Sequence, residues 1–300
     1  KTTLDNSVGP ALVFNPLPQG FYPSQEQAAF DWGLPAKVAL PTSDVDLAFM
    51  PVHQLAVLIK SRQVTSERLT QLYLQRIKTH SDTLACLVTL LEEEALTQAR
   101  ALDKELAAGK YRGPLHGIPY GIKDLFAVPG TKTTWGADPY KDQVINETAT
   151  IVTKLEQAGG VLVGKFTLGA LAMGDVWFGG VTKNPWNLKQ GSSGSSAGSA
   201  SAVGAGLVPF AIGTETLGSI VSPSTRNGVT GLRPTFGRIS RHGAMALSWS
   251  MDKVGPISRS ALDNAIVLAV LNGSDTKDPA TIPAAFNYSV KKDVKKLKVG

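Results

Sequence analysis

Short apolar runs that alternate with helical stretches place the strongest constraint on how this 300-residue chain can fold. Residues 119–122, 161–163 and 208–212 are apolar runs of strand length, whereas residues 148–158 and 197–205 have the pattern of helices. Such alternation is typical of a sheet whose faces are covered by helices. We therefore expect an α/β fold.

The chain before this region divides into an irregular arm and a helical segment. Residues 1–46 are rich in Pro, Gly and isolated aromatics and show no sustained period, which predicts an N-terminal arm without regular structure. A single domain is expected over residues 47–300. Its first predicted elements are helices at 55–60 and 66–78, the second capped by Ser66 and buried through Leu69, Leu72, Leu74 and Ile77, a strand at 84–91 and a helix at 92–108.

The residues at the two ends of the chain lead to expectations about the domain boundary and a possible leader. Residues 297–299 resemble the opening of a strand, so we expect a domain that is incomplete at its C-terminus. The chain begins with Lys1 rather than Met, which is compatible with a removed leader. The compartment therefore stays open between the cytoplasm and export.

Composition does not favour nucleic-acid, zinc or membrane chemistry. Most of the net charge of +6 comes from five lysines and one aspartate in residues 291–298, which favours a solvated basic patch over a phosphate-binding surface. The single cysteine, Cys86, excludes an internal disulfide and a cysteine cluster for zinc, and its apolar neighbours predict a buried strand position. No apolar run approaches the roughly 20 residues that cross a bilayer.

A run of small polar residues interrupts the apolar pattern. Residues 191–201 read GSSGSSAGSAS. A flexible linker is one interpretation, but an apolar run at 202–207 and a strand-like run follow at once, so there is no second domain to link. We therefore place the run inside the domain, where its glycines permit unusual backbone dihedrals beside a reacting centre.

A second small-residue element follows the strand-like run. Residues 213–220 read GTETLGSI, and turns at this place in α/β sheets commonly bind ligands. A tight turn directs several backbone N–H groups at one point, as the negative oxygen of a tetrahedral intermediate requires. Ser219, at the end of the turn, is therefore a candidate nucleophile.

A serine nucleophile needs a base, and histidine is the usual one. No G-x-S-x-G element lies convincingly between a strand and a helix, although spacing alone leaves a distant histidine open as a partner. Structural hydrogen bonding explains His116 and His242 more simply. The histidines of the chain are His53, His80, His116 and His242.

Three ordered motifs resemble the amidase signature family. Residues 194–220, GSSAGSASAVGAGLVPFAIGTETLGSI, are similar to its GGSSGGSA and GTDTGGSI elements with the small-residue helix between them. Residues 117–124, GIPYGIKD, resemble its lysine motif, and residues 228–237, GVTGLRPTFG, resemble its following segment. The resemblance covers about residues 52–275. It implies one domain with a single large mixed β-sheet sandwiched between helix layers.

The resemblance also implies a Ser-Ser-Lys site. Ser219 is the expected nucleophile, Lys123 the base, and Ser195, after a cis peptide bond, the relay between them. Free lysine has a pKa of about 10.4, so a neutral base requires burial that disfavours the ammonium form. The apolar run before Lys123 favours burial over a surface position. The implied acyl-enzyme chemistry requires neither a metal nor an organic cofactor.

The resemblance further implies an oxyanion hole, formed by the backbone N–H groups of Thr216, Leu217 and Gly218. Leu217 replaces a family glycine, so its side chain is expected to narrow the acyl side of the pocket. The positions that depart from the family pattern are Ser193, Ala197, Glu215, Leu217 and Val221.

Two further patterns receive structural interpretations. Residues 159–166 match the spacing of a phosphate-binding loop until Phe166, where Ser or Thr should bind magnesium, and their middle is a strand run. Nucleotide binding is therefore not favoured. Four charged residues are expected to support the site or the fold: Asp124, Asp175, Glu215 and Arg233.

These observations predict an amidase that cleaves a small-molecule amide, as a monomer or a homo-oligomer. The alternative within the family is the glutaminase subunit of a tRNA-dependent amidotransferase, which needs partner subunits. The N-terminal arm and the changes at Leu217 and Val221 favour the stand-alone enzyme. The alternative from another class is an inactive binding protein or fragment, which the presence of Lys123, Ser195 and Ser219 together disfavours.

Overall fold

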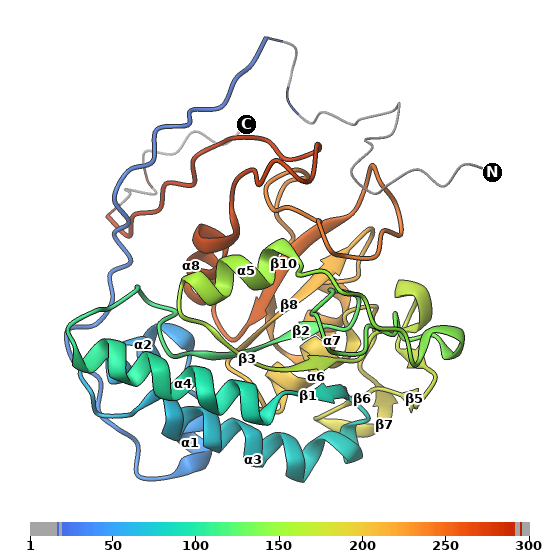
Figure 1. The fold of residues 1–300 in the computed structure, drawn as a ribbon, viewed down its shortest axis with the longest axis horizontal. Helices are drawn as coiled ribbons and strands as arrows, with labels where there is room; N and C mark the ends of the chain where they lie inside the picture. The colour runs from blue at the N-terminus through green and yellow to red at the C-terminus, as the bar shows by residue number, and fades with distance from the viewer. Residues whose placement is uncertain (1–16, 18–19, 292–294, 296–300) are drawn as a thin grey trace.

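The computed structural model describes residues 17, 20–291 and 295, and its centre is a six-stranded mixed sheet (Figure 1). Strand β2 pairs in parallel with β3 and β8, and the remaining pairings are antiparallel. The predicted α/β fold with one large mixed sheet is confirmed. In spatial order the strands are β1 (Leu87–Leu90), β3 (Val161–Phe166), β2 (Pro119–Lys123), β8 (Phe210–Glu215), β10 (Lys253–Ser258) and β9 (Thr230–Gly231).

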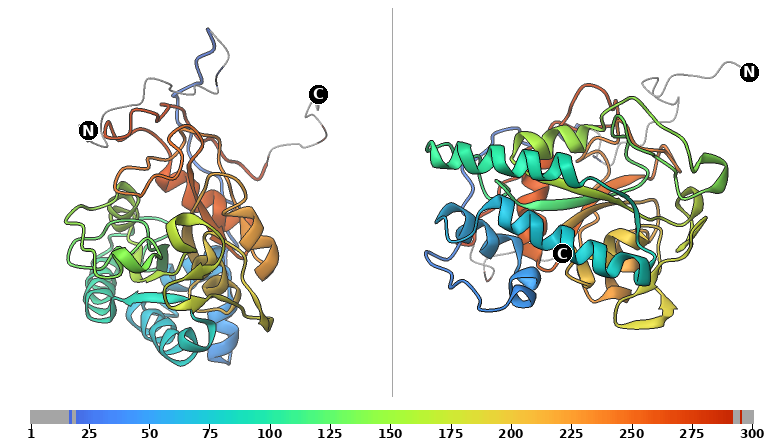
Figure 2. Two further views of the ribbon diagram at one scale, coloured as in Figure 1. Left: turned by 90° about the vertical axis from the view of Figure 1, so that its right-hand side faces the viewer. Right: turned by 60° about the horizontal axis from the view of Figure 1, so that its bottom comes forward.

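Helices cover both faces of the sheet. Figure 2 shows α6 and α7 on one side of the strands and α5 on the other. The helices of the described residues are α1 (Asp44–Phe49), α2 (Val52–Lys60), α3 (Ser66–Leu84), α4 (Glu92–Ala107), α5 (Thr150–Gln157), α6 (Ala197–Gly204), α7 (Val221–Asn227) and α8 (Ala261–Leu271), with short 3-10 turns at Asp138–Tyr140 and Ala170–Ala172. In this part of the chain, no helix combines the length and the apolar character that a membrane span requires.

Two small hairpin sheets lie between β3 and α6, in a region for which the sequence predicted no elements. One consists of β4 (Val176–Trp177) and β5 (Gly180–Val181), and the other of β6 (Lys183–Asn184) and β7 (Asn187–Gly191). The second hairpin leads directly into the small-residue run before α6.

The register between β2 and β3 contains a bulge. Pro119 and Tyr120 lie opposite Val161 and Leu162, but the next residue, Gly121, lies opposite Gly164. One residue of β3 is therefore skipped. Beyond the bulge, Ile122 lies opposite Lys165, and Lys123 lies opposite Phe166.

Helix α3 confirms the predicted inward face but not the predicted ends. The four apolar residues predicted to face inward are all buried. The helix continues to Leu84 rather than ending at residue 78. The predicted cap at Ser66 is wrong, because Thr65 is the N-cap and its hydroxyl accepts the N–H of Arg68 at 3.0 Å. Both residues are hydroxyl-bearing, so the sequence did not distinguish them.

The strand predicted at residues 84–91 is shorter than expected. Leu84 belongs to α3, and the strand β1 begins at Leu87. Cys86 is buried, as predicted, but it lies directly before the strand rather than within it. The helix predicted at residues 92–108 is confirmed as α4.

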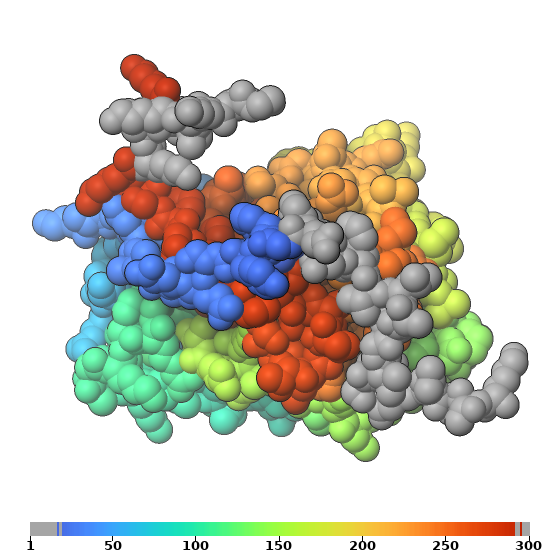
Figure 3. Space-filling model, turned by 90° about the horizontal axis from the view of Figure 1, so that it is seen from above, coloured from blue at the N-terminus to red at the C-terminus, as the bar shows by residue number. Residues whose placement is uncertain are grey.

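Much of the described N-terminal segment runs beside the last described residues (Figure 3). Residues 20–43 contain no helix or strand, apart from an isolated bridge between Asp31 and Ser289. The Gln27 side chain donates to the carbonyl of Phe286 at 2.9 Å. Helix α1 begins at Asp44, slightly before the predicted arm boundary at residue 46, which stays a prediction. The strand predicted at residues 297–299 lies outside the described residues.

Arg259 connects the first helices to the sheet and its helices. It directly follows β10, and its guanidinium donates five hydrogen bonds, each 3.0 Å long, to backbone carbonyls. A planar group with five donors is suited to several acceptors at once. The acceptors belong to Ala48, Phe49, Met50, Val203 and Val208.

Replacing Arg259 by Met should destabilise the protein by about 3 kcal/mol, because five carbonyls lose a charged donor while the apolar length is kept. Chemical denaturation measures the free energy of unfolding. Arg100→Met is the matched control, since the Arg100–Glu67 ion pair is largely exposed and should contribute below about 1 kcal/mol. Equal effects of the two substitutions would contradict this role for Arg259.

Candidate active site

Lys123 is the last residue of β2, and its side chain is fully buried. Its Nζ donates to Ser195 Oγ at 2.8 Å and to Thr214 Oγ1 at 2.9 Å. Thr214 lies on β8, which pairs in parallel with β2. The parallel pairing of β2 and β8 therefore brings the lysine to a hydroxyl pair that comes from two separate chain segments.

Burial lowers the pKa of Lys123 to about 7, because the desolvated ammonium form is disfavoured. The carboxylates of Asp252 and Glu215 oppose this change without cancelling it. A substantial fraction of the amine is therefore neutral near pH 7, as the sequence-based hypothesis of a lysine base requires.

Ser195 lies in the loop between β7 and α6, and the peptide bond between Gly194 and Ser195 is cis. A side chain at position 194 would clash with the backbone, because a Cβ there would lie 1.8 Å from the carbonyl oxygen of Gly174. Ser196, the next residue, donates from its hydroxyl to the carbonyl of Thr214 at 3.1 Å. The small-residue run is thus a packed part of the domain and not a linker.

Ser219 lies in the turn after β8 and is 9% exposed. Its carbonyl accepts the N–H of Ser196 at 3.1 Å, so the turn is joined to the residue that follows Ser195. Within the described part of the chain, its hydroxyl has no hydrogen-bond partner. The structure therefore bonds Lys123 directly to Ser195 and joins Ser219, through its backbone, to the residue that follows Ser195.

The buried carboxylate of Glu215 organises this turn. It accepts the N–H groups of Ile220 at 2.8 Å and Val221 at 3.0 Å, and Arg233 donates to it at 3.1 Å. Burial alone raises the pKa of Glu215, but the N–H groups of Val221, Ile220 and Gly218, together with Arg233, outweigh burial and hold it below its usual range. Glu215 is thus an ionised anchor beneath the turn, as its supporting role predicted.

The contact between the Gly218 N–H and Glu215 affects the predicted oxyanion hole. Since the Gly218 N–H is directed at the Glu215 carboxylate, it is at least partly engaged. The N–H of Leu217 donates to no residue that the structure describes. The Thr216 hydroxyl donates to Asp252, which fixes the start of the turn. The roles of Thr216, Leu217 and Gly218 as oxyanion donors stay a prediction.

Other predicted supporting residues have defined partners. Asp124 forms a buried ion pair with Lys165, with 2.9 Å between Oδ1 and Nζ. Asp175 accepts the N–H of Ser193 at 2.8 Å and so holds the loop that precedes Ser195. Because Lys165 is a buried residue of β3 and is paired with Asp124, the lysine of the phosphate-loop pattern has a structural role.

Three of the histidines have structural partners, as expected for two of them. His116 Nε2 lies 3.0 Å from the carbonyl of Leu102. His242 Nε2 lies 3.1 Å from a carboxylate oxygen of Glu147. His53 Nδ1 lies 2.8 Å from Asp263 Oδ1. In the described residues, no group of three or more His, Cys, Asp or Glu side chains is arranged to hold a metal ion.

Sequence reasoning missed Thr214 and Asp252. Thr214 lies in the GTE element, but no local pattern indicated that β8 would lie next to β2.

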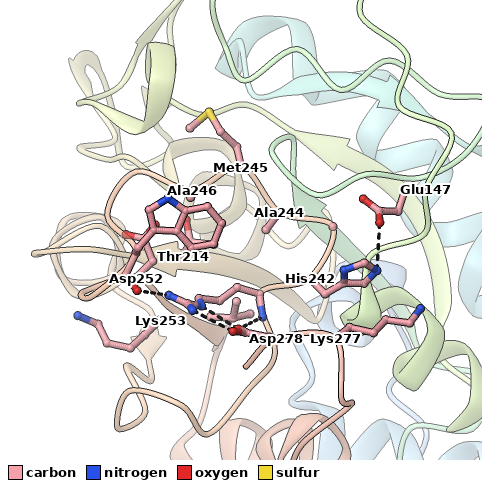
Figure 4. A pocket seen from close by; sticks show the side chains of 14 residues that line it. Glu147, Thr214, His242, Ala244, Met245, Ala246, Asp252, Lys253, Lys277 and Asp278 are labelled. Carbon is pink, nitrogen blue, oxygen red and sulfur yellow. Dashed lines mark hydrogen bonds and ion pairs between the residues drawn. The ribbon is translucent and has the colours of Figure 1, made fainter. Parts of the chain in front are cut away.

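A small cavity of about 40 Å³ reaches Thr214 from the segment 241–249 (Figure 4). Arg241 and Asp278 form an ion pair at its wall. This cavity is far below the roughly 300–1,000 Å³ that is usual for ligand pockets.

Comparisons with known proteins agree with this fold. The family model described as Amidase matches residues 68–300. The A subunit of glutamyl-tRNA(Gln) amidotransferase from Nitrosococcus oceani is 40% identical over 253 residues, which are 82% of this chain and 52% of that protein. The corresponding protein from Coxiella burnetii is 43% identical over 228 residues, 75% of this chain and 47% of that protein. The chain therefore belongs to the amidase family.

Solved structures give the same picture. Native peptide amidase from Stenotrophomonas maltophilia has a TM-score of 0.73 and 38% identity, covering 77% of this chain and 50% of that chain. Fatty acid amide hydrolase has a TM-score of 0.76 and 27% identity, covering 82% of this chain and 45% of that chain. The chain thus spans about half the length of the curated relatives and solved structures that it matches.

Glu215→Ala should loosen the turn, because the N–H groups of Ile220 and Val221 lose their acceptor. We expect the hydrogen-exchange protection of these two amides to fall at least tenfold. Ser222 is an internal reference, since its N–H donates to the Gly218 carbonyl rather than to Glu215. Glu215→Gln, which keeps one oxygen acceptor, should show an intermediate effect. Unchanged protection in both variants would refute the anchoring role.

Proposed function

We propose that the protein hydrolyses carboxamide C–N bonds, with Ser219 as nucleophile, Ser195 as relay and Lys123 as base. The observation that carries the proposal is the 2.8 Å contact between Lys123 Nζ and Ser195 Oγ, in a site where burial lowers the pKa of the lysine to about 7. A neutral amine bonded to a serine hydroxyl can accept a proton through that hydroxyl.

The proposed reaction has two halves. Ser219 Oγ attacks the amide carbonyl, and its proton passes through Ser195 to Lys123. The negative oxygen of the tetrahedral intermediate is stabilised by N–H groups of the turn, for which Thr216 and Leu217 are the less engaged candidates. The proton then moves to the departing amine as the C–N bond breaks. Water hydrolyses the acyl-enzyme by the same relay in reverse.

The second candidate is the glutaminase activity of an amidotransferase subunit, which the identities of 40% and 43% to such subunits favour. The two functions share the chemistry of C–N cleavage and differ in partners. Ammonia release from glutamine that requires added partner subunits would support the second candidate, whereas hydrolysis of simple amides by the isolated intact protein supports the first. The presence of Lys123, Ser195 and Ser219 together, with Lys123 bonded to Ser195, disfavours an inactive binding protein.

Labelling with a fluorophosphonate, followed by peptide mapping, should place the adduct on Ser219. Ser219→Ala should abolish labelling, because the nucleophilic oxygen is removed. Lys123→Ala should slow labelling by several orders of magnitude while the circular dichroism spectrum is retained. The control is the Ser222→Ala variant, which lacks a neighbouring serine. This variant should still be labelled on Ser219 at the wild-type rate. An adduct on a serine other than Ser219 would overturn the nucleophile assignment.

The pH dependence of kcat/KM should follow the Lys123 amine. The base works only when neutral, so activity is low below its pKa, rises through about pH 7 and levels off above it. Lys123→Ala should remove this rising limb from the residual activity. Initial rates measured from about pH 5 to about pH 9 give the profile. A wild-type profile that is flat across this range would contradict the base role.

A further inference from the structure

An open groove of about 550 Å³ adjoins the Ser219 turn. It is lined by Thr216 and Leu217 of that turn, by residues 233–236, and by Ser250, Met251 and Lys253. We call it the Leu217 groove. Its volume is within the range of small-molecule sites, unlike the small cavity at Thr214. The side chains that give it its character are Leu217, Arg233, Pro234, Phe236, Met251 and Lys253.

The Leu217 groove has an apolar part. Leu217 is 79% exposed and Met251 is 43% exposed, and Pro234 and Phe236 line the same space. Covering such side chains with an apolar group is favourable by about 25 cal/mol per Å² of apolar surface removed from water. The Leu217 side chain thus lines the groove next to the Ser219 turn. The expectation from sequence that it narrows the acyl side of the pocket stays a prediction.

The same groove is cationic. Arg233 and Lys253 line it, and no acidic side chain of the described residues does so. Two carboxylates lie nearby. Glu215 is buried under the turn and pairs with Arg233, and Asp252 accepts the N–H groups of Leu247 and Ser248 at 2.7 and 2.9 Å.

Lys253 has unused donor capacity. Its Nζ donates to the Thr216 carbonyl at 2.9 Å. Across residues 20–291, no carboxylate lies within ion-pair distance of it. An ammonium group has three donors, so two are available to a ligand. Arg233, which is 48% exposed, offers further donors beside its bond to Glu215.

We propose that the Leu217 groove binds the acyl part of the substrate, and that this part combines an apolar chain with a terminal carboxylate. The proposal rests on the proposed amidase function, because the carbonyl of a bound amide would lie against the turn that carries Leu217. The apolar chain contacts Leu217 and Met251, and the carboxylate binds Lys253. Monoamides of dicarboxylic acids have this chemistry.

A matched pair of amides tests the proposal in the intact protein. Adipamate and hexanamide have the same six-carbon acyl length, and only adipamate ends in a carboxylate. The wild-type protein should favour adipamate at least tenfold in kcat/KM, and Lys253→Met should reduce this ratio about tenfold, mainly through KM. The control is Lys189→Met, an exposed cation on β7 away from the groove lining, which should keep the wild-type ratio.

Direct binding separates this inference from the catalytic proposal. Calorimetry with the Ser219→Ala variant should show tighter binding of adipamate than of hexanamide, and the difference should depend on Lys253. If neither amide is hydrolysed while this binding preference is present, the proposed function fails, and what stands is the preference of the groove for an apolar chain that ends in a carboxylate. Equal kcat/KM values or equal binding of the two amides would overturn the groove assignment. If Lys253→Met lowered kcat/KM equally for both amides, the groove assignment would also be overturned. Lys253 would then act by holding the Thr216 carbonyl and not by binding the carboxylate of the substrate.

Discussion

The candidate site depends on an amine that can lose its charge inside the protein core. An ammonium group is costly to remove from water, so its pKa falls until the neutral form becomes accessible. The contacts of Lys123 Nζ with Ser195 and Thr214 satisfy the amine without a direct ion pair. The parallel neighbours β2 and β8 and the loop before α6 all have to be in place for this environment to exist.

The make-up of the candidate site was largely predictable because its parts lie in local motifs. The lysine motif and the two Gly/Ser elements pointed to Lys123, Ser195 and Ser219 from sequence alone, and the first two lie in contact. Thr214 was not predictable as the second partner of the lysine. Its contact depends on which strands are neighbours, and strand order is set by tertiary packing rather than by local pattern.

The fold was predictable in class but not in detail. The apolar runs indicated β2, β3 and the position of β8, because buried strands are apolar along their whole length. Strand β10, KVGPIS, was missed since it contains Gly and Pro, which normally weaken a strand prediction. Helix α8, ALDNAIVLAVL, was missed because it is apolar on nearly every face and lacks a clear helical period.

The bulge between β2 and β3 has a consequence for charge. An unbroken register from the pairing of Pro119 with Val161 would set Lys165 directly across from Lys123, and two neighbouring ammonium groups in the same desolvated layer would repel each other. The skipped residue moves Phe166 into that position and leaves Lys165 to Asp124. One irregular step in a strand ladder thus separates a lysine that is paired with a carboxylate from a lysine that is bonded only to hydroxyl and carbonyl oxygens.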